Sequence, residues 1–353
     1  MNEFQQTIKS EVKIKGVGLH TGKEVNLSIK PANPGFGIRF KRVDLPNEPI
    51  VKADVDYVVD TSRGTTLEYN GARINTVEHL LAALVGCEVD NALIELDNVE
   101  IPILDGSAYG FIEAINATGI QVQDAKKIYF TIDTNLQFID EEKNVDILAV
   151  PANGYQVTTM IDFNSPVLGT QHASIKNIKE FGKEIAPART FCFLHELEQL
   201  IEHNLIKGGD LNNAIVVVDK VISDEQLTKL AGIFNQPKVE VLKEGILNNI
   251  SLHFPNEPAR HKLLDVIGDL SLCGYALKGH IIANRPGHAS NVAFAKQIKQ
   301  YIKQNKSLAG MPSYDPTQAP VYDINHITKS LPHKFPFLLV DKIIEMSDSE
   351  VVG

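Results

Sequence analysis

The chain nearly repeats one of its segments, and this repeat constrains its fold more than any other feature. Val25-Asn-Leu-Ser-Ile-Lys-Pro-Ala-Asn33 recurs as Val145-Asp-Ile-Leu-Ala-Val-Pro-Ala-Asn153. Apolar residues alternate in both copies, which indicates two strands that end in the same turn. A second echo follows in the same order, Asn91-Ala-Leu-Ile-Glu-Leu-Asp97 against Asn213-Ala-Ile-Val-Val-Val-Asp219. Two correlated echoes favour two similar domains, whereas Pro-Ala-Asn alone is short enough to recur by accident.

The order of the predicted elements sets the domain boundaries. Each half reads as strands, a helix, a strand and a helix, and alternating strands with interspersed helices favour an α+β layered architecture. We therefore predict one domain over residues 1–123 and a second over 124–304, with the active site between them. Residues 305–321 have the composition of a linker, and 322–353 are too few to form a core of their own. The stretch 221–249 has no counterpart in the first half and is predicted to be an added surface element.

Composition excludes several classes of protein. The chain has 353 residues, 43% of them hydrophobic, which suffices for a sizeable core. No stretch of about 18 uninterrupted apolar residues is present, and the start lacks the apolar centre of a signal peptide, so we expect a cytoplasmic protein. A formal charge of −10 with scattered basic residues argues against a nucleic-acid partner. Cys87, Cys192 and Cys273 are far apart among apolar residues and are expected to be buried free thiols.

Two helix-like segments carry the parts of a metal site. His261 and Asp265 lie four residues apart, so a helix places both on one face, close enough to share one metal ion. Glu78 and His79 are adjacent and cannot share a face, which suits one metal ligand beside a carboxylate that acts as general base. Each piece also has a structural interpretation. His79 alone could be an interior histidine, Glu78 could complete a capping box with Asn75, and the His261/Asp265 pair could be a surface hydrogen bond.

Further candidates lie in loops or at strand ends. His288 stands in a glycine-containing loop that leads into a helix, where it either reaches an active site or serves as a polar residue at the helix start. Thr190 and Phe191 offer a hydroxyl beside an aromatic ring, and Asp162 with Phe163 ends a strand. His20 lies in a glycine-rich turn that could meet phosphate through its amides, although a simple hairpin explains the turn equally well.

Five motifs together resemble one known family. Val77-Glu-His-Leu-Leu-Ala-Ala-Leu84, Leu104-Asp-Gly-Ser107, Ala188-Arg-Thr-Phe191, His261-Lys-Leu-Leu-Asp265 and Gly287-His-Ala-Ser-Asn291 resemble the UDP-3-O-acyl-N-acetylglucosamine deacetylases, in the family's order. The resemblance spans about Phe4 to Tyr301. It implies a zinc amidase of lipid A synthesis, built from two similar α+β domains packed as a β-α-α-β sandwich. The substrate that it implies is a UDP-3-O-acyl-N-acetylglucosamine, with at most transient contact between the enzyme and the membrane surface.

The resemblance also assigns roles. It implies that His79, His261 and Asp265 hold zinc, or iron(II), which the same ligands accept. Glu78 becomes the general base, Thr190 an oxyanion donor, and His288 the protonated group that serves the leaving amine and is held by Asp269. Lys262 is expected near the reacting carbonyl or a phosphate, while Phe163 and Phe191 pack against the sugar and base. His20 and Asp162 match positions near the nucleotide sugar, and 193–206 is the candidate wall of an acyl passage.

The last residues carry a second resemblance. Ile324-Asn-His-Ile-Thr-Lys-Ser-Leu-Pro-His-Lys-Phe-Pro-Phe-Leu-Leu-Val-Asp341 is similar to the opening of 3-hydroxyacyl-acyl-carrier-protein dehydratases of the hot-dog fold. Residues 322–353 are therefore predicted to be the first part of a dehydratase module in a bifunctional fusion, with His333 at the position of that family's catalytic histidine. No dehydratase activity is expected from this chain.

Two rival functions are kept beside the deacetylase. One is a zinc hydrolase that acts on a different acylated sugar. The other is a metal-free module that binds a nucleotide sugar, which the presence of Glu78, His79, His261 and Asp265 disfavours.

Overall fold

The structure is a computed structural model of the whole chain. It describes residues 2–196, 213–220, 222–233, 239–242, 245–247, 250–309, 319–332, 338, 340–346 and 351–352. Contacts divide the chain into two compact units, Met1–Lys299 and Gln300–Gly353. The first unit contains every candidate site residue.

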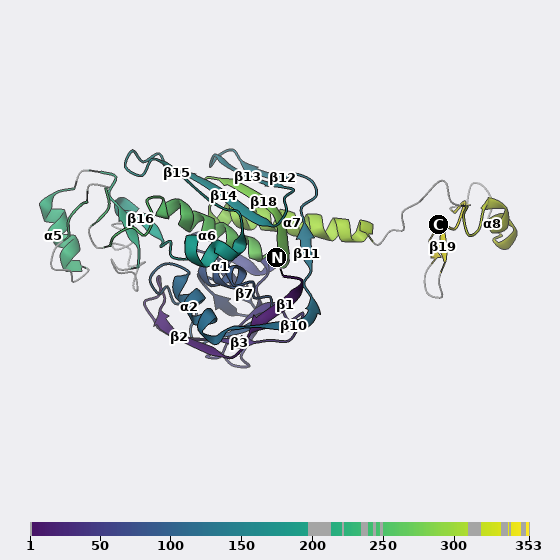
Figure 1. Cartoon of the computed structure of the whole chain (residues 1–353), viewed down its shortest axis with the longest axis horizontal. Coiled ribbons are helices and arrows are strands. Elements are labelled where there is room, and N and C mark those ends of the chain that lie inside the picture. The colour runs from purple at the N-terminus through teal and green to yellow at the C-terminus, as the bar shows by residue number, and fades with distance from the viewer. Residues whose placement is uncertain are drawn as a thin grey trace. The chain divides into compact units, whose positions relative to one another are not determined.

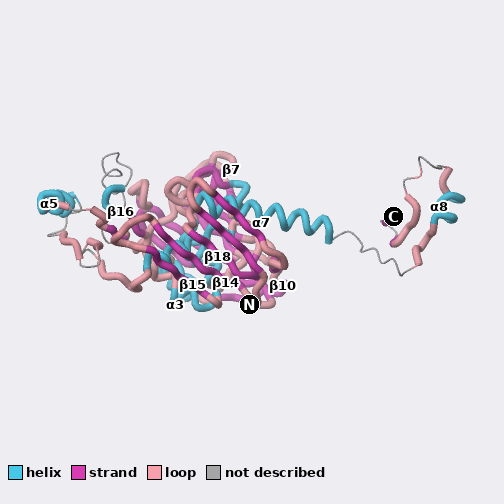
Figure 2. Tube along the Cα trace, turned by 90° about the horizontal axis from the view of Figure 1, so that it is seen from above, coloured by secondary structure: helices cyan, strands magenta, loops and turns pink. Residues whose placement is uncertain are grey.

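Two sheets of the first unit share one topology. The first has the order β2-β3-β9-β4-β5 and the second contains the path β12-β13-β18-β14-β15. In each sheet the third strand is antiparallel to the second and parallel to the fourth. Figure 2 shows β18, β14 and β15 of the second sheet side by side. The strand bounds are β2 Val12–Val17, β3 Glu24–Pro31, β4 Ile38–Arg42, β5 Ile50–Lys52, β9 Ala92–Leu96, β12 Leu136–Asp140, β13 Val145–Val150, β14 Tyr155–Asp162, β15 Thr170–Ile175 and β18 Ala276–Asn284.

Of the two echoes that predicted a repeat, one is confirmed and one is wrong. Its first echo falls on β3 and β13, which occupy the same place in their sheets. Its second echo is wrong, because the counterpart of β9 is β18, whereas Ile215–Val217 (β17) pairs with β16 (Phe191–Phe193) in a separate small parallel sheet. Short apolar runs look alike in sequence, and the partner of a strand is decided by residues far away in the chain.

Helices α1 (Glu78–Gly86) and α6 (Glu257–Ser271) pack against each other at the centre of the unit. Figure 1 shows them in the middle, with β14 and β18 on one side and β2 and β3 on the other. Alternation along β3, β13, β14 and β18 buries every second side chain, so each sheet turns one apolar face inward. Nearly every residue of α1 and α6 is buried, as expected for helices covered on all sides.

Several predicted helices are confirmed by these elements. The helix predicted after the His288 loop is α7 (His288–Ala309), and α2 (Tyr109–Thr118) follows the Leu104-to-Ser107 motif. The added stretch contains α5 (Asp224–Ile233), which packs with Val239 and Leu247 against one face of the β16–β17 sheet. Most of residues 193–206, the predicted wall of the acyl passage, lies outside the described residues, as do most of the predicted linker and His333.

The remaining elements complete the two units. The predicted boundary at 123/124 falls within β10, which pairs with β1, and the domain limits stay a prediction.

No described helix is both long and apolar enough to cross a membrane. All three cysteines are free, and Cys273 is fully buried while Cys87 and Cys192 are partly buried. The other elements are β1 Phe4–Ile8, β6 Val58–Asp60, β7 Thr66–Tyr69, β8 Ala72–Ile74, β10 Ile120–Lys126, β11 Tyr129–Thr131, the 3-10 turns Val55–Tyr57 and Ile178–Glu180, α3 Phe181–Glu184, α8 Ile324–Ser330, β19 Glu345–Met346 and β20 Val351–Val352.

Candidate active site

The first turn of α1 presents Glu78 and His79 to the interior. Both side chains are buried, with 3% and 5% of their surface exposed. The capping box with Asn75 is not formed, because α1 has no side-chain cap and the Glu78 carboxylate accepts a hydrogen bond from the Thr65 amide at 2.9 Å. Glu78 therefore projects away from its own helix start and toward α6, as a functional carboxylate would.

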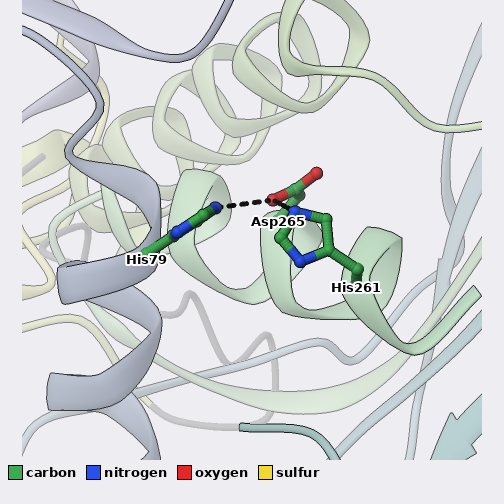
Figure 3. Close-up of side chains that lie close together, drawn as sticks. All are labelled: His79, His261 and Asp265. Carbon is green, nitrogen blue, oxygen red and sulfur yellow. Dashed lines mark ion pairs between the residues drawn. The ribbon is translucent and has the colours of Figure 1, made fainter. Parts of the chain in front are cut away.

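Helix α6 presents His261 and Asp265 on one face, as their spacing predicts. His261 Nε2 lies 3.5 Å from Asp265 Oδ1, and His79 Nε2 reaches the same oxygen at 3.9 Å across the helix pair. Figure 3 shows the two rings converging on the carboxylate from different helices. The possible ligand atoms of these three buried residues all lie within 4.8 Å of one another. This is the geometry of three ligands around one ion.

Gly268 is what allows the two helices to come this close. A Cβ atom at this position of α6 would lie 2.2 Å from the backbone oxygen of Glu78. Any side chain here would force α1 and α6 apart. The absence of a side chain thus sets the spacing between the two halves of the ligand set.

The charge states of the three residues match those that a metal requires. Burial, reinforced by His261, lowers the pKa of His79 to about 3, and burial also lowers the pKa of His261. Burial alone would raise the pKa of Asp265, but Lys262 and the neighbouring imidazoles outweigh it and hold this pKa well below its usual range. Metal ligation needs neutral imidazoles and an ionised carboxylate. The site presents this set at neutral pH.

One ring nitrogen of His261 is already engaged. Its Nδ1 lies 3.0 Å from the backbone carbonyl oxygen of Ala188, which fixes Nδ1 as the donor and leaves Nε2 free to accept a metal. Such a partner for the second nitrogen is usual for metal-bound histidines. The donor set and its support therefore fit a divalent metal ion.

Glu78 has the properties of a general base beside this set. Burial raises its pKa to about 7, with Asp269 and Asp265 adding to the rise and His288 opposing it. Its Oε1 lies 3.9 Å from His288 Nε2. A carboxylate of raised pKa holds a proton more readily than an ordinary one, as proton transfer near neutral pH requires.

His288 begins α7 and is held by Asp269. The Nδ1 atom of His288 lies 2.9 Å from Asp269 Oδ2, and the Asn291 amide donates to the same oxygen at 2.9 Å. Burial alone would lower the pKa of His288, but Asp269, Asp265 and Glu78 outweigh it and raise this pKa to about 9. His288 is thus a cation at neutral pH, 3.9 Å from both Glu78 and Asp265.

Lys262 links the ligand set to the aromatic residues. Its ammonium lies 2.7 Å from Asp265 Oδ2 and 5.6 Å from the centre of the Phe191 ring. Burial alone would lower the pKa of Lys262, but the carboxylate of Asp265 more than compensates and raises it. The lysine is therefore charged and lies between the metal ligands and a hydrophobic wall.

The wall is formed by Phe163, Phe191 and Phe193. Phe163 lies at the end of β14 with 40% of its surface exposed, and its ring is 5.5 Å from Phe191 and 5.6 Å from Phe193. The neighbouring Asp162 lines a hollow of about 250 Å³ together with Gly287, next to His288. The structure thus brings both predicted aromatic residues together near Lys262.

Thr190 is positioned by two neighbouring segments. Its amide donates to the Gly106 carbonyl at 2.8 Å, and its carbonyl accepts from the Ile215 amide at 2.8 Å. Gly106 has a φ of +85°, and a Cβ there would lie 1.9 Å from the Asn213 carbonyl oxygen, so only glycine fits. The Leu104-to-Ser107 motif therefore supports the loop of Thr190.

The turn that carries His20 has a structural role. The backbone amides of His20 and Thr21 donate to the buried Glu100 carboxylate at 3.0 and 2.9 Å. These amides are therefore not available to a phosphate group, and the hairpin interpretation is confirmed. The His20 Nε2 atom lies 3.0 Å from the carbonyl of Arg63, two residues before Thr65, which contacts Glu78.

Sequence reasoning missed Glu257, which holds the loop beside the ligand set. Its carboxylate is fully buried and accepts hydrogen bonds from the amide and guanidinium of Arg189 at 3.0 and 2.8 Å, and from the His253 amide at 2.6 Å. Arg189 lies between Ala188, which contacts His261, and Thr190. Glu257 precedes His261 by four residues, and this helix spacing was the signal that could have identified it.

The comparisons with known proteins agree with this geometry. A sequence model of the family described as "LpxC: UDP-3-O-acyl N-acetylglycosamine deacetylase" matches residues 5–232 and 225–300. The protein called "Bifunctional enzyme LpxC/FabZ" in Chlorobaculum tepidum is 45% identical over 353 residues, which covers 99% of this chain and 75% of that protein. The namesake in Porphyromonas gingivalis is 43% identical over 349 residues, again 99% of this chain and 75% of the relative.

The chain is also similar to proteins that are named only as deacetylases. The UDP-3-O-acyl-N-acetylglucosamine deacetylase of Myxococcus xanthus is 40% identical over 295 residues, which covers 83% of this chain and 86% of that protein. The sequence matches and the buried His-His-Asp group both support the resemblance read from the five motifs. The chain belongs to the UDP-3-O-acyl-N-acetylglucosamine deacetylase family.

Proposed function

We propose that the protein hydrolyses the N-acetyl group of UDP-3-O-(3-hydroxyacyl)-N-acetylglucosamine in a zinc-dependent reaction of lipid A biosynthesis. The products are UDP-3-O-(3-hydroxyacyl)-glucosamine and acetate. The observation that carries the proposal is the buried group of His79, His261 and Asp265, with Glu78 of raised pKa beside it. Zinc bound there would polarise the amide carbonyl. It would also lower the pKa of a water molecule, so that this water can lose a proton and attack the carbonyl carbon.

Two residues carry out the proton transfers, Glu78 and His288. Glu78 accepts the proton of the attacking water, and His288, charged and oriented by Asp269, donates a proton to the leaving amine. The Thr190 hydroxyl and the Lys262 ammonium stabilise the negative charge that develops on the carbonyl oxygen. The two proton carriers lie 3.9 Å apart, within reach of one reacting group.

The substrate contacts follow from the surroundings of the ligand set. Phe163 and Phe191 offer ring faces to the sugar and the base, and Asp162 with His20 lies toward the nucleotide sugar. The apolar residues that pack behind Phe191, including Phe193, Ile215, Val217 and Ile246, favour the β16–β17 sheet as one wall of the acyl passage. The added stretch with α5 packs on the opposite face of that sheet and so supports the wall from behind.

We also propose that the first unit is a pair of duplicated domains, 1–123 and 124–304, arranged as a β-α-α-β sandwich. The shared strand order of the two sheets and the contact between α1 and α6 support this arrangement. Residues 322–353 would open a dehydratase module after a linker over 305–321, in line with the names of the bifunctional relatives. The protein would act in the cytoplasm, with at most transient membrane contact and without nucleic acid.

Metal analysis of a Glu78→Ala variant tests the proposed chemistry. The variant should retain about one zinc ion per chain, because Glu78 is outside the ligand set. It should lose roughly 10²- to 10⁴-fold in turnover, as expected when a general base is removed. The matched control is His79→Ala in the same helix turn, which should lose both the zinc and the activity.

The rival functions give different results. Acetate release from unacylated UDP-N-acetylglucosamine at an equal rate would favour a hydrolase of another sugar. A wild-type protein that holds neither zinc nor iron(II) and releases no acetate would instead be a binding module. Full activity of Glu78→Ala would show that another group is the base.

A further inference from the structure

A cavity lies on the side of the helix pair that faces away from the metal ligands. Its volume is about 180 Å³, and its apolar lining includes Leu81 and Leu84 of α1, Ile267 of α6 and Leu277 of β18. Leu81 follows His79 by two positions, and Ile267 follows Asp265 by two. Two positions turn a helix by roughly 200°, so these residues lie on the opposite faces of α1 and α6 from the ligands. The cavity is therefore separate from the active site, although the same two helices build both.

The size of the cavity indicates the size of its ligand. An engineered apolar cavity of about 150 Å³ in another protein binds benzene. The present cavity is slightly larger and is lined mainly by aliphatic and aromatic side chains. It would accept one six-membered ring with a small substituent.

Tyr155 gives the cavity one polar contact. This residue lines it, is only 8% exposed, and its hydroxyl makes no hydrogen bond to any described residue. The hydroxyl is not enclosed by protein on all sides, so a molecule in the cavity can reach it, and a tyrosine hydroxyl in an apolar site usually finds a partner. A ligand with one hydrogen-bonding group would supply that partner.

Anionic ligands are disfavoured, because the lysines that line the cavity are already paired with carboxylates. Lys127 is paired with Asp90 at 2.8 Å, and Lys52 with Asp54 at 3.1 Å. Neither ammonium is therefore left to neutralise an anion. Burial of an unpaired charge in an otherwise apolar site is costly.

We propose that this cavity is a binding site for a small, uncharged, mainly apolar molecule with a single hydrogen-bonding group, of about the size of phenol. The two halves of the first unit both contribute to it, through α1 and α6. Its ligand would bind without displacing a substrate from the metal site. The proposal is independent of the deacetylase activity, and so is its test.

The test measures the binding of phenol and toluene to the full chain by nuclear magnetic resonance. Both should bind wild-type protein and shift the methyl signals of Leu81 and Leu84. Phenol should bind about fivefold more tightly in wild-type protein than in Tyr155→Phe, the value of one hydrogen bond, while toluene should bind both alike. Absence of methyl shifts in wild-type protein, or equal phenol binding by Tyr155→Phe, would overturn the proposal.

A filled cavity provides the matched comparison. Val85→Phe places a ring into the cavity from α1 and should weaken both ligands at least tenfold, whereas Val122→Phe, at a position 60% exposed on β10, should leave binding unchanged. Undiminished binding by a folded Val85→Phe would place the ligand elsewhere. Benzoate and benzylamine, which are charged at neutral pH, should bind more weakly than phenol, and tighter binding of either would contradict an uncharged ligand.

Discussion

At the scale of single residues, Asp265 is the centre of the site. It lies within 4 Å of His79, His261, Lys262 and His288, and its own charge keeps the last two protonated. The sequence predicted these partners, because motif and helix spacing identify side chains that converge. It could not predict the roles of Thr65 and Asn291, because these come from hydrogen bonds between distant segments.

The charge of His288 leads to a prediction about pH. Its raised pKa means that the protonated form is present below about pH 9 and is lost as pH rises through that value. Asp269→Asn removes the carboxylate that favours this proton, so the alkaline limb of kcat/KM should move to lower pH by about one unit or more. A pH profile of the variant against wild type measures the shift.

An Asp-to-Asn substitution outside the site is the control for the loss of one negative charge in Asp269→Asn. Asp97→Asn removes a carboxylate that contacts only Asn26 among the described side chains and should leave the profile in place. An alkaline limb that stays fixed in Asp269→Asn would assign it to a group other than His288.

At the scale of elements, the contact of α1 with α6 decides whether the site forms. Sequence periodicity identified both helices and the faces that carry the ligands. It could not show that they touch, nor that β18 rather than β17 is the counterpart of β9, because strand order depends on long-range pairing.

Gly268→Ala tests this contact. The new Cβ would lie 2.2 Å from the Glu78 backbone oxygen, so the helices must separate. Overpacking of this kind costs about 1–3 kcal/mol, and the displaced His79 should weaken zinc binding. Denaturant unfolding and competition with a chelator measure the two effects.

Gly232→Ala in α5 is the matched control. A Cβ at Gly232 meets nothing within 4 Å, so the same change should leave zinc affinity unaltered and leave stability equal or slightly higher. If Gly268→Ala bound zinc as tightly as wild type, the helix spacing would not determine the site.

At the scale of the whole molecule, every candidate site residue belongs to the unit Met1–Lys299. The sequence predicted a repeated architecture from two echoes and from the five family motifs, and only the first echo falls on equivalent strands. The sequence did not show what the 221–249 stretch packs against. In the structure, α5 of this stretch packs against the small β16–β17 sheet.

Removal of the last segment should therefore leave the deacetylase intact. A chain that ends at Gln304 keeps Ile298 and Ile302, two buried residues in the later part of α7, and should retain its zinc and a kcat/KM within about twofold of the full chain. A chain that ends at Ala295 lacks both isoleucines and should unfold more easily. Loss of activity in the chain that ends at Gln304 would reveal a contribution from residues 305–353.

The pairing of α1 with α6 has a consequence for how the site responds to dilution. Each helix alone supplies an incomplete ligand set, as each subunit does in a dimer with a shared metal. Here one chain carries both helices, so their encounter is intramolecular and occurs at a fixed effective concentration. Zinc affinity should accordingly stay constant as the protein is diluted, and the enzyme can work at low copy number without an assembly step.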